Sequence, residues 1–335
     1  MQTQPGFRVA VIGATGLVGA TMREVLRERN FPISEFLPVA SARNVGRSLS
    51  FGDREWTVRS LEDACAAAPD FALFSAGGAV STEWAPRFAA AGTVVIDNSS
   101  AWRLDPAVPL IVPEVNGSVL RPDHRLIANP NCTTAQLVVA LAPLHAAFGV
   151  VRGVVSTYQS VTGTGAAAIA QLEAERQGLP PHPAVYPHPI DRNCIPHCDS
   201  FLDSGYTKEE MKVWHETKKI LGDPDVAITC TAVRVPVLGG HSESVYLELA
   251  RDFTPDAVRQ LLEQAPGLTV VDDPQQARYP MPRDAAGKDT VFVGRIRPDL
   301  SHPRGLHLWI VADNLRKGAA TNAVQIAEHM AALRS

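Results

Sequence analysis

The chain has 335 residues, enough for two domains of roughly 150 residues each with a sizeable core. Hydrophobic residues make up 45% and charged residues 20%, which is typical of an ordinary soluble globular protein. The formal net charge is −4 and the basic residues are scattered, so nothing indicates a nucleic-acid surface and a small-molecule partner is favoured.

The N-terminus and the cysteines bear on the compartment. Residues 1–6 carry no basic flank and lead directly into a short apolar run, which predicts neither a signal peptide nor a membrane span. Five cysteines in so long a chain are typical of reduced thiols rather than a disulfide framework. We therefore expect a cytoplasmic protein.

The first expected strand is Phe7–Ile12, an apolar run followed at once by a glycine-rich turn and a helical pattern from Leu17 to Arg29. This order is the context of a dinucleotide-binding turn, in which glycines let the backbone approach the pyrophosphate and the helix N-terminus faces it. The spacing G-x-x-G-x-x-G differs from the usual G-x-G-x-x-G, and a tight turn without a ligand is the alternative. The expected cofactor contacts are Gly13, Thr15, Gly16, Leu17 and Val18.

The second expected strand, Phe36–Ala40, bears on cofactor choice. An NAD-selective enzyme usually places an acidic residue after this strand, against the ribose hydroxyl. Here the chain has Ser41, Arg43 and Asn44. Arg43 could stack on adenine and pair with a 2′-phosphate, which favours NADP; a solvated surface arginine is the alternative.

Further buried strands are expected at 71–74, 93–97 and 110–112, with polar or glycine-rich loops after the first two. Ligands of open α/β sheets bind beyond the carboxyl ends of the strands, so these loops should face the cofactor. Arg103, in the second loop, is a candidate anion-binding residue.

Cys132 lies where an apolar run ends and a helical pattern from Thr133 to Phe148 begins. Free amides and the dipole at a helix N-terminus favour a thiolate, and the same amides could hold an oxyanion. The alternative is an ordinary buried cysteine.

The second half of the chain is expected to form strands and helices of another domain. A helix should begin near Lys208 with Thr207 as its N-cap. Strands are expected at 151–160, 226–236, 243–251, 290–296 and 306–312, with His241 in a turn and a last helix at 319–333.

Residues 177–203 are rich in Pro, His and Cys. A metal site could be suggested from His182, His188, Cys194, His197 and Cys198, but their spacing matches no standard zinc pattern, so we expect no metal. A long irregular segment of this kind is more often an interface or partner-covering loop.

Six motifs together resemble the aspartate-β-semialdehyde dehydrogenase family over nearly the whole chain. They occur in the family's order at residues 13–19, 97–103, 129–133, 158–163, 240–243 and 313–320. The resemblance implies an N-terminal Rossmann-type parallel sheet and a second α+β catalytic and dimerisation domain, as in semialdehyde and glyceraldehyde-3-phosphate dehydrogenases. It implies an NADP-binding domain of residues 1–132 plus 315–335 and a catalytic domain of residues 133–314.

The resemblance also implies roles for individual residues. Cys132 would be the nucleophile and His241 the acid–base partner. The expected substrate contacts are Arg103 and Lys212 for phosphate, Gln159 near the nucleophile, Glu209 for the α-ammonium and Arg234 for the α-carboxylate. Thr162, Gly163 and Asn314 would contact NADP.

The implied reaction is the reductive dephosphorylation of L-aspartyl-4-phosphate by NADPH to L-aspartate-4-semialdehyde, in lysine, threonine, methionine and isoleucine biosynthesis. The implied assembly is a homodimer, with neither a nucleic acid nor a membrane as partner. The alternatives are an acyl-phosphate reductase for another substrate and a non-catalytic nucleotide-binding paralogue.

Overall fold

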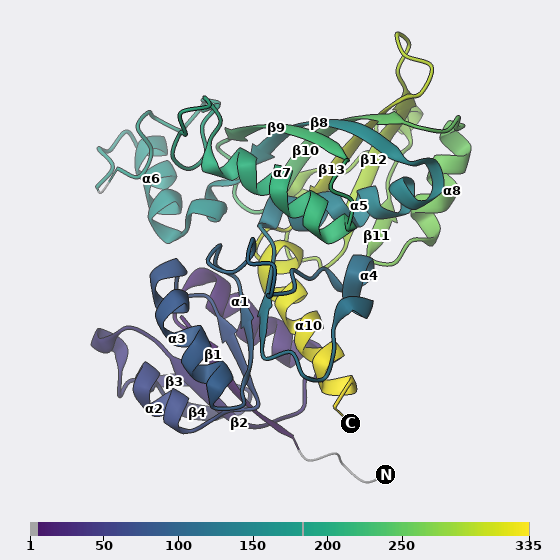
Figure 1. Cartoon of the computed structure of the whole chain (residues 1–335). Coiled ribbons are helices and arrows are strands. Elements are labelled where there is room, and N and C mark those ends of the chain that lie inside the picture. Colours follow the sequence, from purple (N-terminus) through teal and green to yellow (C-terminus); the bar gives the residue numbers. More distant parts are fainter. Residues whose placement is uncertain (1–5, 183, 335) are drawn as a thin grey trace. The chain divides into compact units, whose positions relative to one another are not determined.

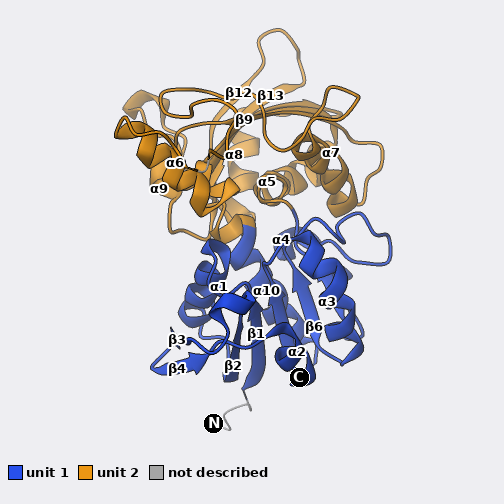
Figure 2. Cartoon of the chain, turned by 90° about the vertical axis from the view of Figure 1, so that its left-hand side faces the viewer, with its two compact units in different colours: residues 1–130, 319–335 blue, residues 131–318 orange. Residues whose placement is uncertain are grey.

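The computed structural model describes residues 6–182 and 184–334, which fall into two compact units. Unit 1 comprises Met1–Pro130 and Ala319–Ser335, and unit 2 comprises Asn131–Gly318 (Figure 2). The expected first domain was 1–132 plus 315–335; the contact-based division instead places residues 131–132 and 315–318 in unit 2. Residues 1–5, on which the absence of a targeting signal was predicted, lie outside the described residues, as do 183 and 335.

Unit 1 contains a five-stranded sheet in the order β2-β1-β5-β6-β7, with every neighbouring pair parallel. Its central strands are continuous apolar runs because both faces of a parallel sheet are covered by helices. The strands are β1 (Phe7–Ile12), β2 (Ile33–Val39), β5 (Phe71–Phe74), β6 (Val94–Asp97) and β7 (Leu126–Ala128). A small antiparallel hairpin, β3 (Ser48–Phe51) and β4 (Arg54–Thr57), lies outside this sheet.

Two apolar clusters show how the helices of unit 1 cover its sheet. One joins α1 (Leu17–Glu28) and α10 (Thr321–Ala332) to alternate residues of the strands, and the other joins α2 (Leu61–Ala66) and α3 (Gly78–Ala90) to the intervening residues. Because successive strand residues point to opposite faces, the two helix pairs lie on opposite sides of the sheet. The short helix α4 (Pro113–Asn116) completes the unit. The Rossmann-type expectation is confirmed.

The strand expected at 110–112 is wrong. Leu110 forms only an isolated bridge to Ala128, and Val112 is already the N-cap of α4. Pro109 and Pro113 flank the segment; proline lacks an N–H for a ladder, and Pro113 occupies the first turn of the helix, a position that proline favours. The three apolar side chains are nevertheless buried, which explains the strand-like sequence pattern.

Unit 2 contains a six-stranded mixed sheet in the order β11-β12-β13-β10-β8-β9. The pairs β8/β9 and β11/β12 are parallel, and the other neighbours are antiparallel. The strands are β8 (Val150–Gln159), β9 (Ala227–Arg234), β10 (His241–Leu249), β11 (Leu268–Val270), β12 (Val291–Pro298) and β13 (Gly305–Ala312). The second α+β domain expected from the sequence is confirmed.

The helices α5 (Cys132–Phe148), α7 (Lys208–Leu221) and α8 (Pro255–Gln264) pack on one face of this sheet (Figure 1). The central one is α5, whose residues 133–141 are all buried between the sheet and its neighbours α7 and α8. The remaining helices are α6 (Ala166–Arg176) and the short α9 (Pro282–Ala285). A nearly all-apolar helix is typical of such an enclosed position.

The two faces of the unit 2 sheet differ in exposure. On β10, His241, Glu243 and Val245 are buried, whereas Ser244 and Tyr246 of the other face are partly accessible. Tyr158 of β8 is 37% exposed on that other face and packs on Trp309 of β13, with ring centroids 5.5 Å apart. On this face the short helix α9 packs against Phe292, Val311 and Trp309, and among the described residues no helix longer than α9 covers it.

No helix in the described ranges is long and apolar enough to cross a membrane.

Candidate active site

Cys132 is the first residue of α5, one position earlier than the predicted helix start. Its side chain is half-buried and forms no disulfide. A Cβ atom added to Gly318 would lie 2.7 Å from the Cys132 Cβ, so any larger residue at 318 would push against the thiol-bearing carbon. A thiol at this helix end experiences the positive end of the dipole, which favours the thiolate.

Asn131 caps α5 and connects it to α7. Its Oδ1 accepts hydrogen bonds from the backbone N–H groups of Thr133 (3.0 Å) and Thr134 (3.2 Å), and its Nδ2 donates to Glu209 (2.9 Å). Its own N–H donates to Glu216 Oε2 at 2.6 Å. Two of the helix amides that we expected to be available for an oxyanion are therefore occupied by the cap.

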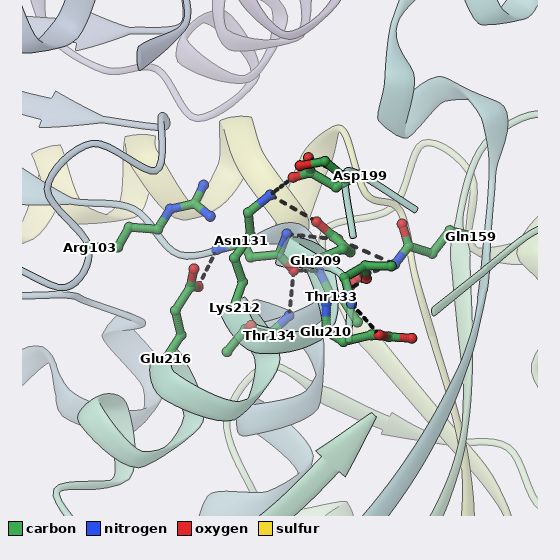
Figure 3. A network of polar contacts seen from close by, with 12 residues as sticks. Arg103, Asn131, Thr133, Thr134, Gln159, Asp199, Glu209, Glu210, Lys212 and Glu216 are labelled. Carbon is green, nitrogen blue, oxygen red and sulfur yellow. Dashed lines mark hydrogen bonds and ion pairs between the residues drawn. The ribbon is translucent and has the colours of Figure 1, made fainter. Parts of the chain in front are cut away.

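Glu209 and Lys212 lie on the same face of α7, as their three-residue spacing predicts, and join the Asn131 network (Figure 3). Glu209 is buried and Lys212 is half-buried. Lys212 Nζ donates to Glu209 (3.1 Å) and to Asp199 (2.8 Å). Burial opposes the charge of Glu209, but Lys212, the Asn131 amide and Arg234 outweigh it and hold the pKa of Glu209 below its usual value. Burial likewise opposes the charge of Lys212, but Glu209 and Asp199 raise the pKa of Lys212, so both groups are charged at neutral pH.

Gln159, the last residue of β8, brings the sheet into the same network. Its Nε2 lies 3.2 Å from Thr133 Oγ1, 3.3 Å from Thr157 Oγ1 and 3.3 Å from Glu209 Oε1. The side chain is buried. The structure thus brings Gln159, Glu209 and the first turn of α5 together.

The peptide groups of Ser160 orient both Arg234 and His241. Arg234 Nη1 donates to the Ser160 carbonyl at 2.7 Å, and the Ser160 N–H donates to His241 Nδ1 at 3.1 Å. A Cβ added to Gly163 would lie 2.9 Å from Arg234 Nη1 and 3.1 Å from His241 Nε2, so both side chains approach the Gly163 backbone closely. Arg234 Nε is buried and has no hydrogen-bond partner among the described residues.

His241 does not lie in a turn, as we expected from its neighbouring glycines. It is the first residue of β10, paired with Ala312, and is fully buried. Gly239 and Gly240, with φ of 78° and 80°, make the turn, and the chain is extended by the time it reaches His241. Burial first, and then Arg234, lower the pKa of His241 to about 3.

The hydrogen bond from Ser160 fixes the His241 tautomer. Since Nδ1 accepts a hydrogen bond, the proton of the neutral ring resides on Nε2. His241 is therefore a neutral hydrogen-bond donor at Nε2. The base role expected from the sequence requires a second ring proton, which burial and Arg234 oppose.

The three residues of unit 2 that we expected to contact the cofactor lie together. Thr162 Oγ1 donates to Asn314 Oδ1 at 3.0 Å, and the Gly240 N–H donates to the same oxygen at 3.1 Å. Ser160 Oγ lies 2.6 Å from Thr162 Oγ1, so this group is continuous with the peptide that holds Arg234 and His241.

The glycine turn of unit 1 has the close backbone approaches expected of a dinucleotide-binding turn. Gly13 has a φ of 87°, and a Cβ there would lie 2.3 Å from the Ser75 carbonyl oxygen. A Cβ on Gly19 would lie 2.1 Å from the Gly13 carbonyl oxygen, so only glycine lets α1 approach β1 this closely. Gly16 is the N-cap of α1 and offers no side-chain acceptor, which leaves the amides near Leu17 and Val18 without a side-chain cap.

The other predicted residues of unit 1 fall into two environments. Ser41 and Arg43 are exposed, and Asn44 is partly so, on a 3₁₀ turn directly after β2. Arg103 is buried, with Nε donating to the Asn129 carbonyl (2.9 Å) and Nη2 to the Asn98 carbonyl (2.6 Å). Backbone carbonyls thus fix the position of Arg103, which the sequence could not indicate.

Several site residues had no predicted role: Asn131, Ser160, Tyr186, Asp199 and Glu216. Asn131 could have been found from its place just before a helix, because asparagine is a favoured N-cap. Asp199 and Tyr186 come from the Pro-, His- and Cys-rich segment, where the sequence gives no register. In the part of the chain that the structure describes, no cluster of three His, Cys, Asp or Glu is arranged to hold a metal ion.

Two family models match the chain. Residues 8–122 match the semialdehyde dehydrogenase NAD binding domain, and residues 141–317 match the semialdehyde dehydrogenase dimerisation domain.

Individual relatives match over nearly their full lengths. The chain is 54% identical to an aspartate-semialdehyde dehydrogenase of Legionella pneumophila, covering 96% of this chain and 95% of the relative. It is 51% identical to that of Aquifex aeolicus, covering 96% and 97%. Among solved structures, aspartate semialdehyde dehydrogenase II of Vibrio cholerae, complexed with ASA, matches with a TM-score of 0.93 and 47% identity over 98% of each chain.

Proposed function

The chain belongs to the aspartate-semialdehyde dehydrogenase family, and we propose that it reduces L-aspartyl-4-phosphate to L-aspartate-4-semialdehyde with NADPH, through a thioester on Cys132. Enzymes of this type act in lysine, threonine, methionine and isoleucine biosynthesis. The observation that carries the proposal is the grouping, within unit 2, of a half-buried cysteine at a helix N-terminus with a carboxylate, an ammonium and a guanidinium.

The charged groups suit the two ends of the substrate. Arg234, with an unpartnered Nε, binds the α-carboxylate as a bidentate pair, and Glu209 accepts the α-ammonium. Lys212 and Arg103 bind the phosphate. Gln159 places the acyl group near the thiolate. Together these contacts hold a flexible substrate in one orientation, which lowers the entropic part of the barrier.

The covalent steps use Cys132. Its thiolate forms a C–S bond with the acyl carbon, the C–O bond to phosphate breaks, and the phosphate takes a proton from solvent. NADPH, when bound, supplies the hydride that reduces the thioester. The C–S bond then breaks as the carbonyl re-forms, which returns the thiolate and releases the aldehyde.

His241 serves as a hydrogen-bond donor in this scheme. Its Nε2–H stabilises the oxygen that gains negative charge when the thiolate attacks and again when the thioester is reduced. This role differs from the base expected from the sequence and needs no change in the charge of the ring.

The cofactor proposal is NADP bound to unit 1. The close glycine contacts and the uncapped N-terminus of α1 fit a pyrophosphate. Exposed Arg43 and Ser41, without a carboxylate in the 3₁₀ turn after β2, fit a 2′-phosphate. In unit 2, Thr162, Gly163 and Asn314 border the nicotinamide.

The assembly proposal is a homodimer in the cytoplasm. The partly apolar face of the unit 2 sheet around Tyr158 and Trp309 fits a second copy of the chain, and sedimentation equilibrium tests this directly. A monomer at micromolar concentration would contradict it. Five cysteines without a disulfide fit a reducing compartment.

The proposed function is tested by phosphate-dependent reduction of NADP with L-aspartate-4-semialdehyde, repeated with NAD. We expect rapid reduction that requires phosphate and is faster with NADP. N-acetylglutamate semialdehyde should react poorly, because its acetylated nitrogen cannot form an ion pair with Glu209. Equal turnover of both aldehydes would favour a reductase for another acyl phosphate, and no turnover of either would favour a non-catalytic paralogue.

A further inference from the structure

Residues 184–199, which we name the strap, have neither helix nor extended strand, yet α6 fixes their backbone. Gln171 Oε1 accepts the N–H groups of Val185 (2.6 Å) and Tyr186 (3.0 Å). One turn later, Glu175 Oε2 accepts those of Ile190 (2.7 Å) and Asp191 (2.8 Å). Gln171 Nε2 also donates to Glu175 at 2.8 Å, so the two holding side chains support each other.

The strap meets β9 at Arg234. The backbone of Ile195 exchanges two hydrogen bonds with that of Arg234, at 2.9 and 2.8 Å, and forms an antiparallel bridge. This fixes the Cα position of Arg234 at the end of its strand. The strap therefore fixes the backbone position from which the Arg234 side chain extends.

Tyr186 holds the other end of the Arg234 side chain. The guanidinium carbon lies 5.9 Å from the centre of the Tyr186 ring, within the range of a cation–π contact. The Tyr186 hydroxyl donates to Thr164 Oγ1 at 3.0 Å, which fixes the direction of the ring. Gly163 approaches Nη1 closely and the Ser160 carbonyl accepts from it, so ring, glycine and carbonyl together restrict the guanidinium.

The strap also holds the second charged substrate contact of unit 2. Asp199, its last residue, accepts a hydrogen bond from Lys212 at 2.8 Å. A segment without regular structure thus touches both Arg234 and Lys212. Ordering a loop costs conformational entropy, and the hydrogen bonds that its amides donate to Gln171 and Glu175 offset that cost.

We infer that the strap is a positioning element for substrate recognition, and that Tyr186 is the residue that orients the Arg234 guanidinium toward the substrate α-carboxylate. The inference rests on the proposed function of Arg234. Tyr186 acts through Arg234 and makes no contact with the reacting carbon. Loss of the ring should weaken the carboxylate contact and leave the chemistry at Cys132 intact.

The test compares Tyr186→Leu, Tyr186→Phe and, as a matched control from an exposed position in the strap, His188→Ala. The readout is phosphate-dependent NADP reduction with L-aspartate-4-semialdehyde and with 3-aminopropanal, which lacks the α-carboxylate. Tyr186→Leu should raise KM for the semialdehyde about tenfold, a change typical of a partly desolvated cation–π contact, with kcat within about twofold of wild type. Its kcat/KM for 3-aminopropanal and its KM for NADP should stay unchanged.

The other variants distinguish a loss of Arg234 orientation from a general disturbance of the fold. Tyr186→Phe keeps the ring but loses the hydroxyl that fixes its direction, so its KM for the semialdehyde should lie between those of wild type and Tyr186→Leu. His188→Ala leaves Arg234 untouched and should behave like wild type. Gln171→Leu, which releases the strap from α6 at a distance, should reproduce the selective loss, and it replaces Tyr186→Leu if that variant does not fold.

Arg234→Lys distinguishes the two possible failures. If it raises KM for the semialdehyde while Tyr186→Leu and Gln171→Leu do not, the strap has no orienting role and the proposed function stands. If Arg234→Lys also leaves KM unchanged, the carboxylate role of Arg234 is wrong. Equal losses on both aldehydes in Tyr186→Leu would show a general structural role and would overturn the inference.

Discussion

At the scale of the residue, the Ser160 peptide determines much of the chemistry, because its N–H and carbonyl hold His241 and Arg234. Cys132 and Gln159 lie in sequence motifs and were predictable as candidates, whereas Arg234 lies in none of the motifs and was expected from the family resemblance. The donor state of His241 was not, because it depends on a hydrogen bond across 81 positions of the chain and on burial in the folded unit. A motif specifies a residue type, whereas the tautomer and the pKa come from tertiary contacts.

The His241 pKa of about 3 leads to a prediction for both activity and stability. Between pH 6.5 and 3 the unfolded chain binds a proton at this position and the folded chain does not, so the free energy of unfolding falls as the pH falls. One such group contributes roughly 1.4 kcal/mol per pH unit over that window. Urea unfolding at pH 7 and pH 5 should show a smaller fall for His241→Gln than for wild type.

The kinetic consequence is that no ionisation of His241 limits activity near pH 6.5. Any fall of kcat at acid pH in the wild-type enzyme should therefore also be present in His241→Gln. An acid limb centred near pH 6.5 that disappears in this variant would restore the base role for His241.

At the scale of the element, the start of α7 is where the sequence prediction and the structure agree most clearly. Thr207 was predicted as its N-cap, and this is confirmed: its side chain accepts the Glu210 N–H while the Glu210 carboxylate accepts the Thr207 N–H, at 3.3 and 2.7 Å. Such a capping box uses contacts only three residues apart, so the sequence contains its full pattern. The prediction of a strand at 110–112 was wrong because a buried apolar segment and a paired strand have the same sequence pattern. Only the backbone hydrogen bonds to a neighbouring strand distinguish the two.

Removal of the α7 cap should affect both stability and substrate binding. Thr207→Ala loses the side-chain half of the box, which should lower the free energy of unfolding by about 1 kcal/mol. Because Glu209 and Lys212 lie in the first turns of this helix, KM for the semialdehyde should also rise.

The matched control is Thr254→Ala, which removes the analogous cap of α8, where Thr254 accepts the Ala257 N–H at 3.2 Å. It should lower stability by a similar amount with KM unchanged. An equal KM in both variants would mean that the start of α7 does not position the substrate contacts.

At the scale of the whole molecule, the sequence was sufficient for the architecture of both units. The strand, glycine turn and helix at the N-terminus predicted the parallel sheet. In the second half, alternating or apolar runs predicted strands, and the family resemblance implied the α+β domain; the order and directions of its strands come from the structure. The position of the strap was beyond sequence patterns, because prolines remove the periodicity that fixes a register. Its contacts depend on α6 and β9, which themselves had to be placed first.

The central claim is a covalent aspartyl intermediate on Cys132, and mass spectrometry tests it most directly. The protein is mixed with L-aspartate-4-semialdehyde and NADP without phosphate, so that the thioester forms and cannot be released as acyl phosphate. We predict an aspartyl group on the peptide that contains Cys132, discharged by added phosphate. Cys132→Ser should bind NADP, carry no adduct and lose nearly all turnover. Turnover like that of wild type in Cys132→Ser, or an adduct at another cysteine, would contradict the mechanism.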